Sequence, residues 1–184
     1  VISQTAQRPR LGCMRLGTEP GESQASEEVI LGALTAGVRL LDTADMYYPA
    51  SGAAGDDERL VRRALDRWVT EHGGDRSTVT VATKGGLTRP GRGRWLPDGR
   101  AKYLEAAAEA SCEALGVEQL DLYQLHGPDP RTKLETSVRA LARLQRAGRV
   151  RDIGLCNVSL AQLRRAQAVA PIAAVQVEIN PFTD

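Results

Sequence analysis

Two side chains that could take part in proton transfer lie close together in the segment Arg39–Tyr47. Asp42 follows the apolar residues Leu40 and Leu41, and Tyr47 comes five positions later. A strand that buries the two leucines would place Asp42 at its carboxyl end, and the turn after it would bring Tyr47 back over the same end. In parallel α/β folds that end of the strand carries the chemistry. The segment therefore predicts one part of a proton-donating site.

Three more polar side chains stand at the ends of predicted strands, and these are Lys84, His126 and Asn157. In a barrel the carboxyl ends of parallel strands ring one mouth, so residues ~40 positions apart can meet there. An ammonium group would lower the pKa of a tyrosine, which is ordinarily near ~10, and an imidazole could polarise a carbonyl or relay a proton. Together with Asp42 and Tyr47 they predict an acid for carbonyl reduction, with a nicotinamide as hydride donor.

Each of these residues also has an ordinary structural interpretation. Asp42 could cap the turn that follows it, and Tyr47 could belong to a surface loop. Lys84 could be solvated, and His126 could simply bond to the backbone. The placement that they share, at the ends of strands, is what favours the catalytic interpretation.

The composition is typical of a globular protein. The 184 residues are 42% hydrophobic and 26% charged with a net charge of +1, which predicts one domain over 1–184 and neither nucleic acid nor a membrane as partner. No apolar run approaches the ~18 residues of a membrane span, and no signal peptide is recognised. Cys13, Cys112 and Cys156 are odd in number and form no C-x-x-C pair. We therefore expect no disulfide framework, no metal site and a cytoplasmic location.

Strands and helices are predicted to alternate along the whole chain. Short apolar runs indicate the strands, and helical periodicity with capping residues indicates the helices between them. The predicted strands are 11–16, 38–42, 79–83, 120–125, 150–155 and 173–179. The predicted helices are 23–36, 57–69, 102–115, a segment from Pro130 that ends at Gly148, and one that Ser159 opens and Pro171 closes.

Residue types also predict several local features. Ser26 is a candidate N-cap of the first helix, and Asp129 is expected to cap the fourth helix, with the proline after it in the first turn. The glycine-rich segment 85–100, which contains Trp95, is interpreted as a loop, and signals for antiparallel hairpins are absent. Residues 1–10 are expected to be frayed.

The alternation favours parallel β/α units. A doubly wound open sheet would satisfy the number of elements, but no G-x-G-x-x-G follows any predicted strand and no G-x-x-x-x-G-K-[ST] occurs. The alternative is a (β/α)8 TIM barrel of which about six of the eight β/α units are present in this chain. A complete barrel of this kind usually needs ~250 residues.

Four segments, in the right order and context, resemble the aldo-keto reductase family. They are Leu41–Tyr47, Ala82–Lys84, Asp121–His126 and Gly148–Asn157. The resemblance implies a (β/α)8 barrel that binds NADPH across its mouth without a Rossmann fold and reduces an aldehyde or ketone to an alcohol. The segment that holds the 2′-phosphate in the family is not in this sequence, so the choice between NADPH and NADH stays open.

The resemblance also implies roles for single residues. Tyr47 would be the general acid, Asp42 and Lys84 would tune it, and His126 would orient the carbonyl. Cys156 stands where the family usually has serine. The implied contacts of the cofactor are Met14, Asp42, Cys156, Asn157 and Gln176.

Three explanations compete for a chain that stops after its sixth predicted strand. It can be part of a longer protein, a truncated protein that a partner chain completes, or a family member used for binding or regulation. The presence of all four proposed catalytic residues favours an enzyme that acts on a small carbonyl compound. The alternative is a nucleotide-sensing module with little turnover. Neither the particular substrate nor the oligomeric state follows from the sequence.

Overall fold

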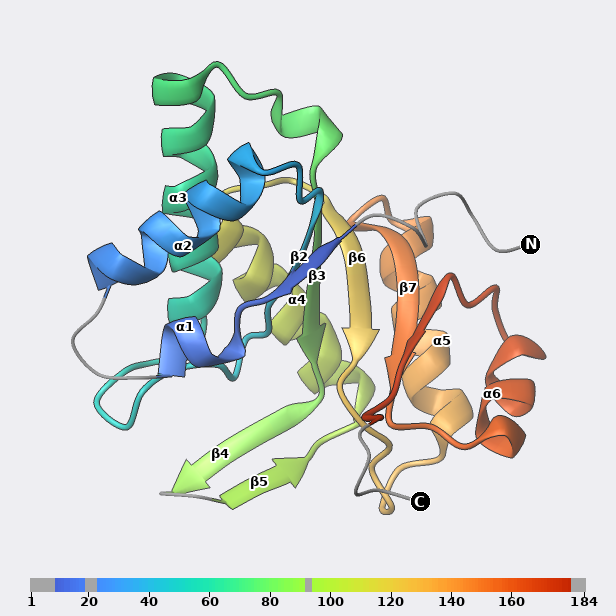
Figure 1. The fold of residues 1–184 in the computed structure, drawn as a ribbon. Coiled ribbons are helices and arrows are strands. Elements are labelled where there is room, and N and C mark those ends of the chain that lie inside the picture. The colour runs from blue at the N-terminus through green and yellow to red at the C-terminus, as the bar shows by residue number, and fades with distance from the viewer. Residues whose placement is uncertain (1–8, 19–22, 92–93, 180–184) are drawn as a thin grey trace. The chain divides into compact units, whose positions relative to one another are not determined.

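The computed structural model describes residues 9–18, 23–91 and 94–179 of the chain (Figure 1). In chain order its elements are β1 (Arg10–Gly12), α1 (Met14–Thr18), α2 (Ser23–Thr35), β2 (Leu40–Asp42), α3 (Asp56–His72), the 3₁₀ helix η2 (Arg76–Thr78), β3 (Thr80–Gly85), β4 (Leu87–Gly91), β5 (Arg94–Pro97), α4 (Ala101–Leu115), β6 (Leu120–Leu125), α5 (Leu134–Arg146), β7 (Val150–Cys156), α6 (Leu160–Gln167) and β8 (Ala174–Gln176).

Six of the strands form one sheet in the order β1-β2-β3-β6-β7-β8, and at least one helix lies in each connection. β2 runs parallel to both of its neighbours, with Leu41 opposite Leu11 of β1 and Val81 of β3. β7 and β8 are also parallel. Strands that follow one another in the sheet through a helix are β/α units. The predicted alternation of strands and helices is confirmed for these six strands, but it does not hold along the whole chain, because β4 and β5 follow β3 with no helix between them.

The chain forms two compact units. The first unit contains 1–83 and 110–121, and the second unit contains 84–109 and 122–184. Each unit is described by itself below. That 1–184 is a single domain stays a prediction.

In the first unit the core forms where α2 and α3 meet, and Figure 1 shows α2 lying across α3. Leu34 of α2 and Val61 and Leu65 of α3 are buried there. Burying a side chain of this size stabilises the fold by about 1.5–3 kcal/mol. Arg39 closes the end of α2, because its guanidinium donates to the carbonyl oxygen of Leu34 at 2.7 Å and lies 4.9 Å from the ring centroid of Trp68. The carbonyl oxygen of Leu34, in the last turn of the helix, also accepts from the amide of Gly37 at 3.1 Å, so this helix end has both backbone and side-chain donors.

In the second unit the amphipathic helix α5 lies against β7 and α6. Its residues Val138 and Leu141 are fully buried, as is Ile153 of β7. On the exposed side, Arg165 of α6 donates to Glu135 of α5 at 2.7 Å. Exposed ion pairs contribute less than about 1 kcal/mol, so burial of the apolar face is what holds these elements together.

The strand predicted over 11–16 is wrong in its second half. β1 has only three residues, and the chain then turns into α1. The amides of Leu16 and Gly17 both donate to the carbonyl oxygen of Cys13, which closes a helical turn inside the apolar run. Ser26 is not the N-cap of α2, which begins three residues earlier. Its hydroxyl donates instead to the carbonyl oxygen of Leu16 at 3.0 Å.

The segment 85–100 is not a loop throughout. β4 and β5 pair as an antiparallel hairpin with Thr88 opposite Leu96, so the expectation of no hairpin was wrong. The register shifts within the hairpin, and this irregularity hides the alternation of side chains that usually indicates paired strands. The hydroxyl of Tyr103 in α4 donates to the carbonyl oxygen of Leu87 at 2.7 Å and fixes the hairpin to the helix.

Two boundaries differ from prediction near the end of the chain. Asp129 does not cap α5, which begins at Leu134 with Lys133 as its N-cap. The last strand was predicted over 173–179 but β8 spans only three residues. Fraying was expected over 1–10, but Arg10 is already part of β1. Residues 1–8 lie outside the described residues.

We expect Gly85→Ala to destabilise the protein. A Cβ atom at Gly85 would lie 2.0 Å from the hydroxyl oxygen of Tyr123, whose side chain is fully buried. Overpacking of this kind costs about 1–3 kcal/mol. Thermal unfolding should show a lower Tm for Gly85→Ala, with partial recovery when Tyr123→Phe is added. Gly12→Ala is the control, because nothing lies within 4 Å of a Cβ atom there. Equal Tm values for Gly85→Ala and the wild type would contradict the expected clash.

Candidate active site

Asp42 and Tyr47 lie at the two ends of one turn in the first unit. Asp42 is the last residue of β2, as predicted, and its carbonyl oxygen accepts a hydrogen bond from the amide of Cys13 at 2.9 Å. Tyr47 is 7% exposed, and its amide donates to the carbonyl oxygen of Ala44 at 3.2 Å. Met14 follows Cys13 at the start of α1 and is 47% exposed. The structure thus places three of the candidate residues around β1 and β2.

Two carboxylates of α3 contact this turn and the neighbouring strand. Asp57 accepts a hydrogen bond from the hydroxyl of Thr43 at 2.6 Å, and the amide of Asp57 donates to the carbonyl oxygen of Tyr47 at 3.2 Å. Glu58 accepts from the hydroxyl of Thr83 at 2.5 Å. Both carboxylates are almost completely buried. A buried carboxylate requires such donors, because water is not there to solvate it.

The sequence contained a signal for these two carboxylates that residue-by-residue reasoning missed. Asp57 and Glu58 fall on the same helix face as the buried residues Val61 and Leu65, three to eight positions further on. Acidic residues on the apolar face of an amphipathic helix must either be paired or become neutral. Burial raises the pKa of Glu58, opposed by the hydrogen bond from Thr83.

Lys84 and His126 lie in the second unit. Lys84 is the penultimate residue of β3 and is 2% exposed. His126 directly follows β6 and is 9% exposed. The amide of His126 donates to the carbonyl oxygen of Gly85 at 2.8 Å. Burial, and then the positive charge of Lys84, lower the pKa of His126 to about 3. The imidazole is therefore neutral at pH 7 and can donate its N–H to a carbonyl oxygen.

Three of the implied cofactor contacts gather where β7 and β8 end. Cys156 lies opposite Gln176 in the register of these strands, and its thiol donates to the Gln176 side-chain oxygen at 3.6 Å. Gln124 donates to the same oxygen at 3.5 Å. The side-chain amide of Asn157 donates to the carbonyl oxygen of His126 at 3.2 Å. Cys156, Asn157, Gln176 and His126 therefore form one connected cluster within the second unit.

The β4–β5 hairpin adds an aromatic surface to this cluster. The ring centroids of Trp95 and His126 are 6.5 Å apart, with the two rings inclined at 67° in an edge-to-face arrangement. The guanidinium of Arg89 lies 5.5 Å from the Trp95 centroid, a cation–π distance. Trp95 is 40% exposed, so a partly open aromatic face stands beside the imidazole.

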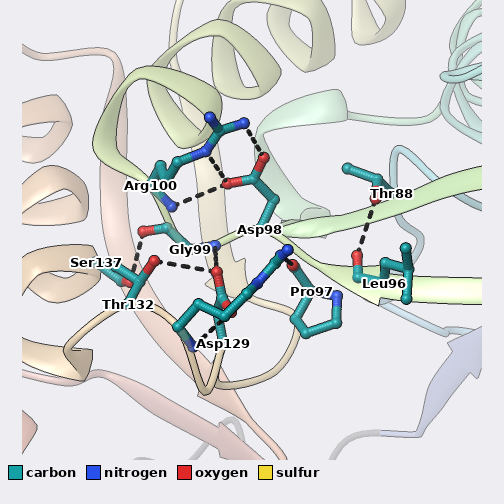
Figure 2. A network of polar contacts seen from close by, with 10 residues as sticks. Thr88, Leu96, Pro97, Asp98, Gly99, Arg100, Asp129, Thr132 and Ser137 are labelled. Carbon is teal, nitrogen blue, oxygen red and sulfur yellow. Dashed lines mark hydrogen bonds and ion pairs between the residues drawn. The ribbon is translucent and has the colours of Figure 1, made fainter.

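Asp129 ties the base of the hairpin to the segment between β6 and α5, as Figure 2 shows. Its carboxylate accepts hydrogen bonds from the amides of Gly99 at 3.1 Å and Arg131 at 2.9 Å and from the hydroxyl of Thr132 at 3.0 Å. The hydroxyl of Ser137 donates to the carbonyl oxygen of Gly99 at 2.7 Å. Burial raises the pKa of Asp129, but these hydrogen bonds outweigh it and hold the pKa at about 2.

Among the helices that the structure describes, none has the length and apolar character needed to cross a membrane. Within residues 9–18, 23–91 and 94–179, no three or more His, Cys, Asp and Glu side chains are grouped so that they could hold a metal ion.

The sequence profile of the Aldo/keto reductase family matches residues 10–184. The chain belongs to this family.

Two curated relatives are similar over nearly the whole chain. Aldo-keto reductase str7 of Strobilurus tenacellus is 37% identical over 177 residues, which are 94% of this chain and 48% of that protein. Aldo-keto reductase yakc [NADP(+)] of Schizosaccharomyces pombe is 34% identical over 175 residues, again 94% of this chain and 48% of that protein. The chain thus spans about half the length of the curated relatives it matches.

Solved structures show the same fold. The glycerol dehydrogenase of Gluconobacter oxydans matches with a TM-score of 0.81 and 31% identity, covering 95% of this chain and 52% of that one. An aldo-keto reductase of Bacillus halodurans matches with a TM-score of 0.75 and 26% identity, covering 92% of this chain and 52% of that one. Both are (β/α)8 barrels, and the six-stranded sheet with its helices is a part of that fold, as predicted.

We expect the stability of the protein to depend on His126 in acid. The pKa of His126 is about 3 in the folded state, against about 6.5 for a histidine in the unfolded chain. Between these values the unfolded chain binds more protons, so the stabilisation is complete above about pH 6.5 and is lost as the pH falls towards 3. Urea unfolding over this range should show a shallower pH dependence for His126→Gln than for the wild type. His72→Gln, at the exposed end of α3, is the control. Parallel curves for wild type and His126→Gln would refute the assignment.

We expect Asp129→Ala to loosen the hairpin. The substitution removes the acceptor of four hydrogen bonds at a buried position, and loss of hydrogen bonds to a charged group costs about 1.5–3 kcal/mol. Hydrogen exchange should become faster in 87–97, and Tm should fall. Asp66→Asn, an exposed carboxylate of α3, should change neither quantity. Unchanged exchange in the hairpin would show that Asp129 does not hold it.

Proposed function

We propose that the protein containing this chain is an NADPH-dependent oxidoreductase that reduces an aldehyde or ketone to an alcohol. Family membership supports this class of reaction. The observation that carries the proposal is the placement of His126, a buried imidazole directly after β6 that lies 6.5 Å from the ring centroid of Trp95 and whose backbone carbonyl accepts from the Asn157 amide. A neutral imidazole can donate its N–H to a carbonyl oxygen, and this hydrogen bond orients and polarises the carbonyl group.

Tyr47 is proposed as the general acid, following the family pattern. Its hydroxyl would give a proton to the carbonyl oxygen as negative charge develops there. An unperturbed tyrosine, with a pKa near ~10, is a weak acid at pH 7. Lys84 is assigned the role of favouring the phenolate and so lowering that pKa, and Asp42 the role of keeping the lysine charged and oriented.

The residues present suit a nicotinamide cofactor. The side-chain amides of Asn157 and Gln176 offer both donors and acceptors, as the nicotinamide carboxamide does, and the Asn157 amide contacts the backbone of His126. When bound, NADPH supplies the hydride that reduces the carbonyl carbon. The Schizosaccharomyces pombe relative has NADP(+) in its name, which supports the same cofactor here. Further proposed contacts are Met14, Asp42 and Cys156.

A small carbonyl compound is the proposed partner, and the cytoplasm is the proposed location. All three cysteines are buried thiols in the structure, which suits a reducing compartment.

Tyr47→Phe tests the assigned acid. General acid catalysis contributes roughly 10²–10⁴-fold, so we expect kcat for NADPH-dependent reduction of a panel of aldehydes to fall about 100-fold or more. The dissociation constant of NADPH, measured by fluorescence titration, should stay within about 3-fold of the wild-type value, because Tyr47 is not among the proposed contacts of the cofactor.

Tyr48→Phe is the matched control, since it removes a hydroxyl from the adjacent position. Its kcat should stay close to that of the wild type. A kcat of Tyr47→Phe equal to that of the wild type would refute the assignment of Tyr47 as the general acid. Tight NADPH binding with no turnover of any carbonyl by the wild type would favour a nucleotide-sensing module instead.

A further inference from the structure

The first turn of α3 presents three carboxylates with different surroundings. Asp56 is partly exposed and pairs with Arg59 at 2.7 Å. Asp57 and Glu58 are 0% and 1% exposed. A helix N-terminus favours negative charge, which accounts for acidic residues at this position but not for their burial. The N-cap is Gly55, which has no side chain to cap the helix. The two buried carboxylates instead accept hydrogen bonds from residues outside α3.

Asp57 holds both sides of the turn that carries Tyr47. Its carboxylate accepts the hydroxyl hydrogen of Thr43, directly after Asp42, at 2.6 Å. Its amide donates to the carbonyl oxygen of Tyr47 at 3.2 Å. A second bond of the same kind joins the amide of Gly55 to the carbonyl oxygen of Asp45 at 2.8 Å. The turn is therefore pinned to the start of α3 at three points.

The carboxylate of Asp57 is also packed against α1. A Cβ atom added at Gly17 of α1 would lie 2.2 Å from its second oxygen, so the backbone of α1 packs directly on the carboxylate. Thr43 is fully buried as well, and its amide donates to the carbonyl oxygen of Ala82 in β3 at 2.9 Å. Thr43 is thus held by β3 through its amide and by α3 through its hydroxyl.

Glu58 makes the equivalent contact one strand further along. It accepts the hydroxyl hydrogen of Thr83 at 2.5 Å. Thr83 is fully buried and directly precedes Lys84 in the chain. Two adjacent residues of one helix therefore each bind a threonine that is the sequence neighbour of a proposed catalytic residue.

We propose that Asp57 and Glu58 are positioning residues for carbonyl reduction, with Asp57 fixing the Asp42–Tyr47 turn through Thr43 and Glu58 fixing the end of β3 through Thr83. This inference rests on the proposed function. Neither carboxylate takes part in the chemistry. Displacing a reacting group by about 1 Å can lower a rate about 100-fold, so the hydrogen bonds that hold its backbone control the rate although they lie behind the site.

The test compares Thr43→Val with Thr43→Ser in the protein containing this chain. Valine keeps the shape of threonine and removes the hydroxyl, whereas serine keeps the hydroxyl. We expect kcat to fall about 10-fold or more in Thr43→Val with KM within about 3-fold, and to be restored largely in Thr43→Ser. Asp56→Asn, a change at the exposed carboxylate of the same helical turn, should behave as the wild type.

Hydrogen exchange supplies a readout that does not depend on activity. The amides of Tyr47, Gly55 and Asp57 should exchange at least about 10-fold faster in Thr43→Val than in Thr43→Ser, because the turn is released from α3. Amides of α5 should be unchanged. If Thr43→Val does not fold, Thr83→Val and Thr83→Ser test the same proposal at the Glu58 contact.

The outcomes separate the two proposals. A wild-type protein that reduces no carbonyl would overturn the proposed function, and the positioning role with it. An active wild type with an equally active Thr43→Val variant would overturn the positioning role alone, whether or not exchange had become faster. A loss of kcat in Thr43→Val that serine restores, together with faster exchange in the turn, would support it.

Discussion

A charged side chain that is taken out of water must be given hydrogen-bond donors or counter-charges, and this requirement governs much of the structure. Asp57 and Glu58 meet it with threonine hydroxyls. Asp129 meets it with backbone amides and a hydroxyl. Each carboxylate has at least one donor from a segment distant in the sequence, namely Thr43, Thr83 and Gly99. The hydrogen bonds that stabilise the buried charge therefore also join these segments. The pKa of His126 is lowered first by burial and then by the positive charge of Lys84, which is itself 2% exposed.

The order of strands and helices could be predicted because each β/α unit has its own apolar pattern. Leu40 and Leu41 before Asp42 indicate a strand whichever fold surrounds them, and the face of α3 repeats with helical period. The helical turn after Cys13 could not be predicted, since a single backbone acceptor decides it. The hairpin around Thr88 and Leu96 escaped for a related reason, because an irregular register breaks the two-residue alternation of its side chains.

The candidate site divides in the same way. Candidate residues at strand ends, such as Asp42 and His126, could be predicted because functional side chains of parallel β/α folds lie at the carboxyl ends of the strands. The contacts of Asp129 could not, because its donors belong to residues whose positions depend on the hairpin. The cluster of Cys156, Asn157 and Gln176 lies between these cases. Strand register places Cys156 opposite Gln176, whereas the bond from Asn157 to the His126 backbone depends on a local backbone conformation.

That conformation limits which amino acids position 157 can accept. Asn157 has a φ of 57°, in the left-handed region where most side chains clash with their own backbone. Glycine would adopt it more easily but has no amide to reach the carbonyl oxygen of His126. Glutamine has the amide but neither the short reach nor the same tolerance of positive φ. Asparagine meets both demands at once. Substitutions of Gln176 or Cys156 would strain the backbone less than substitutions of Asn157, because these two residues lie in ordinary strands.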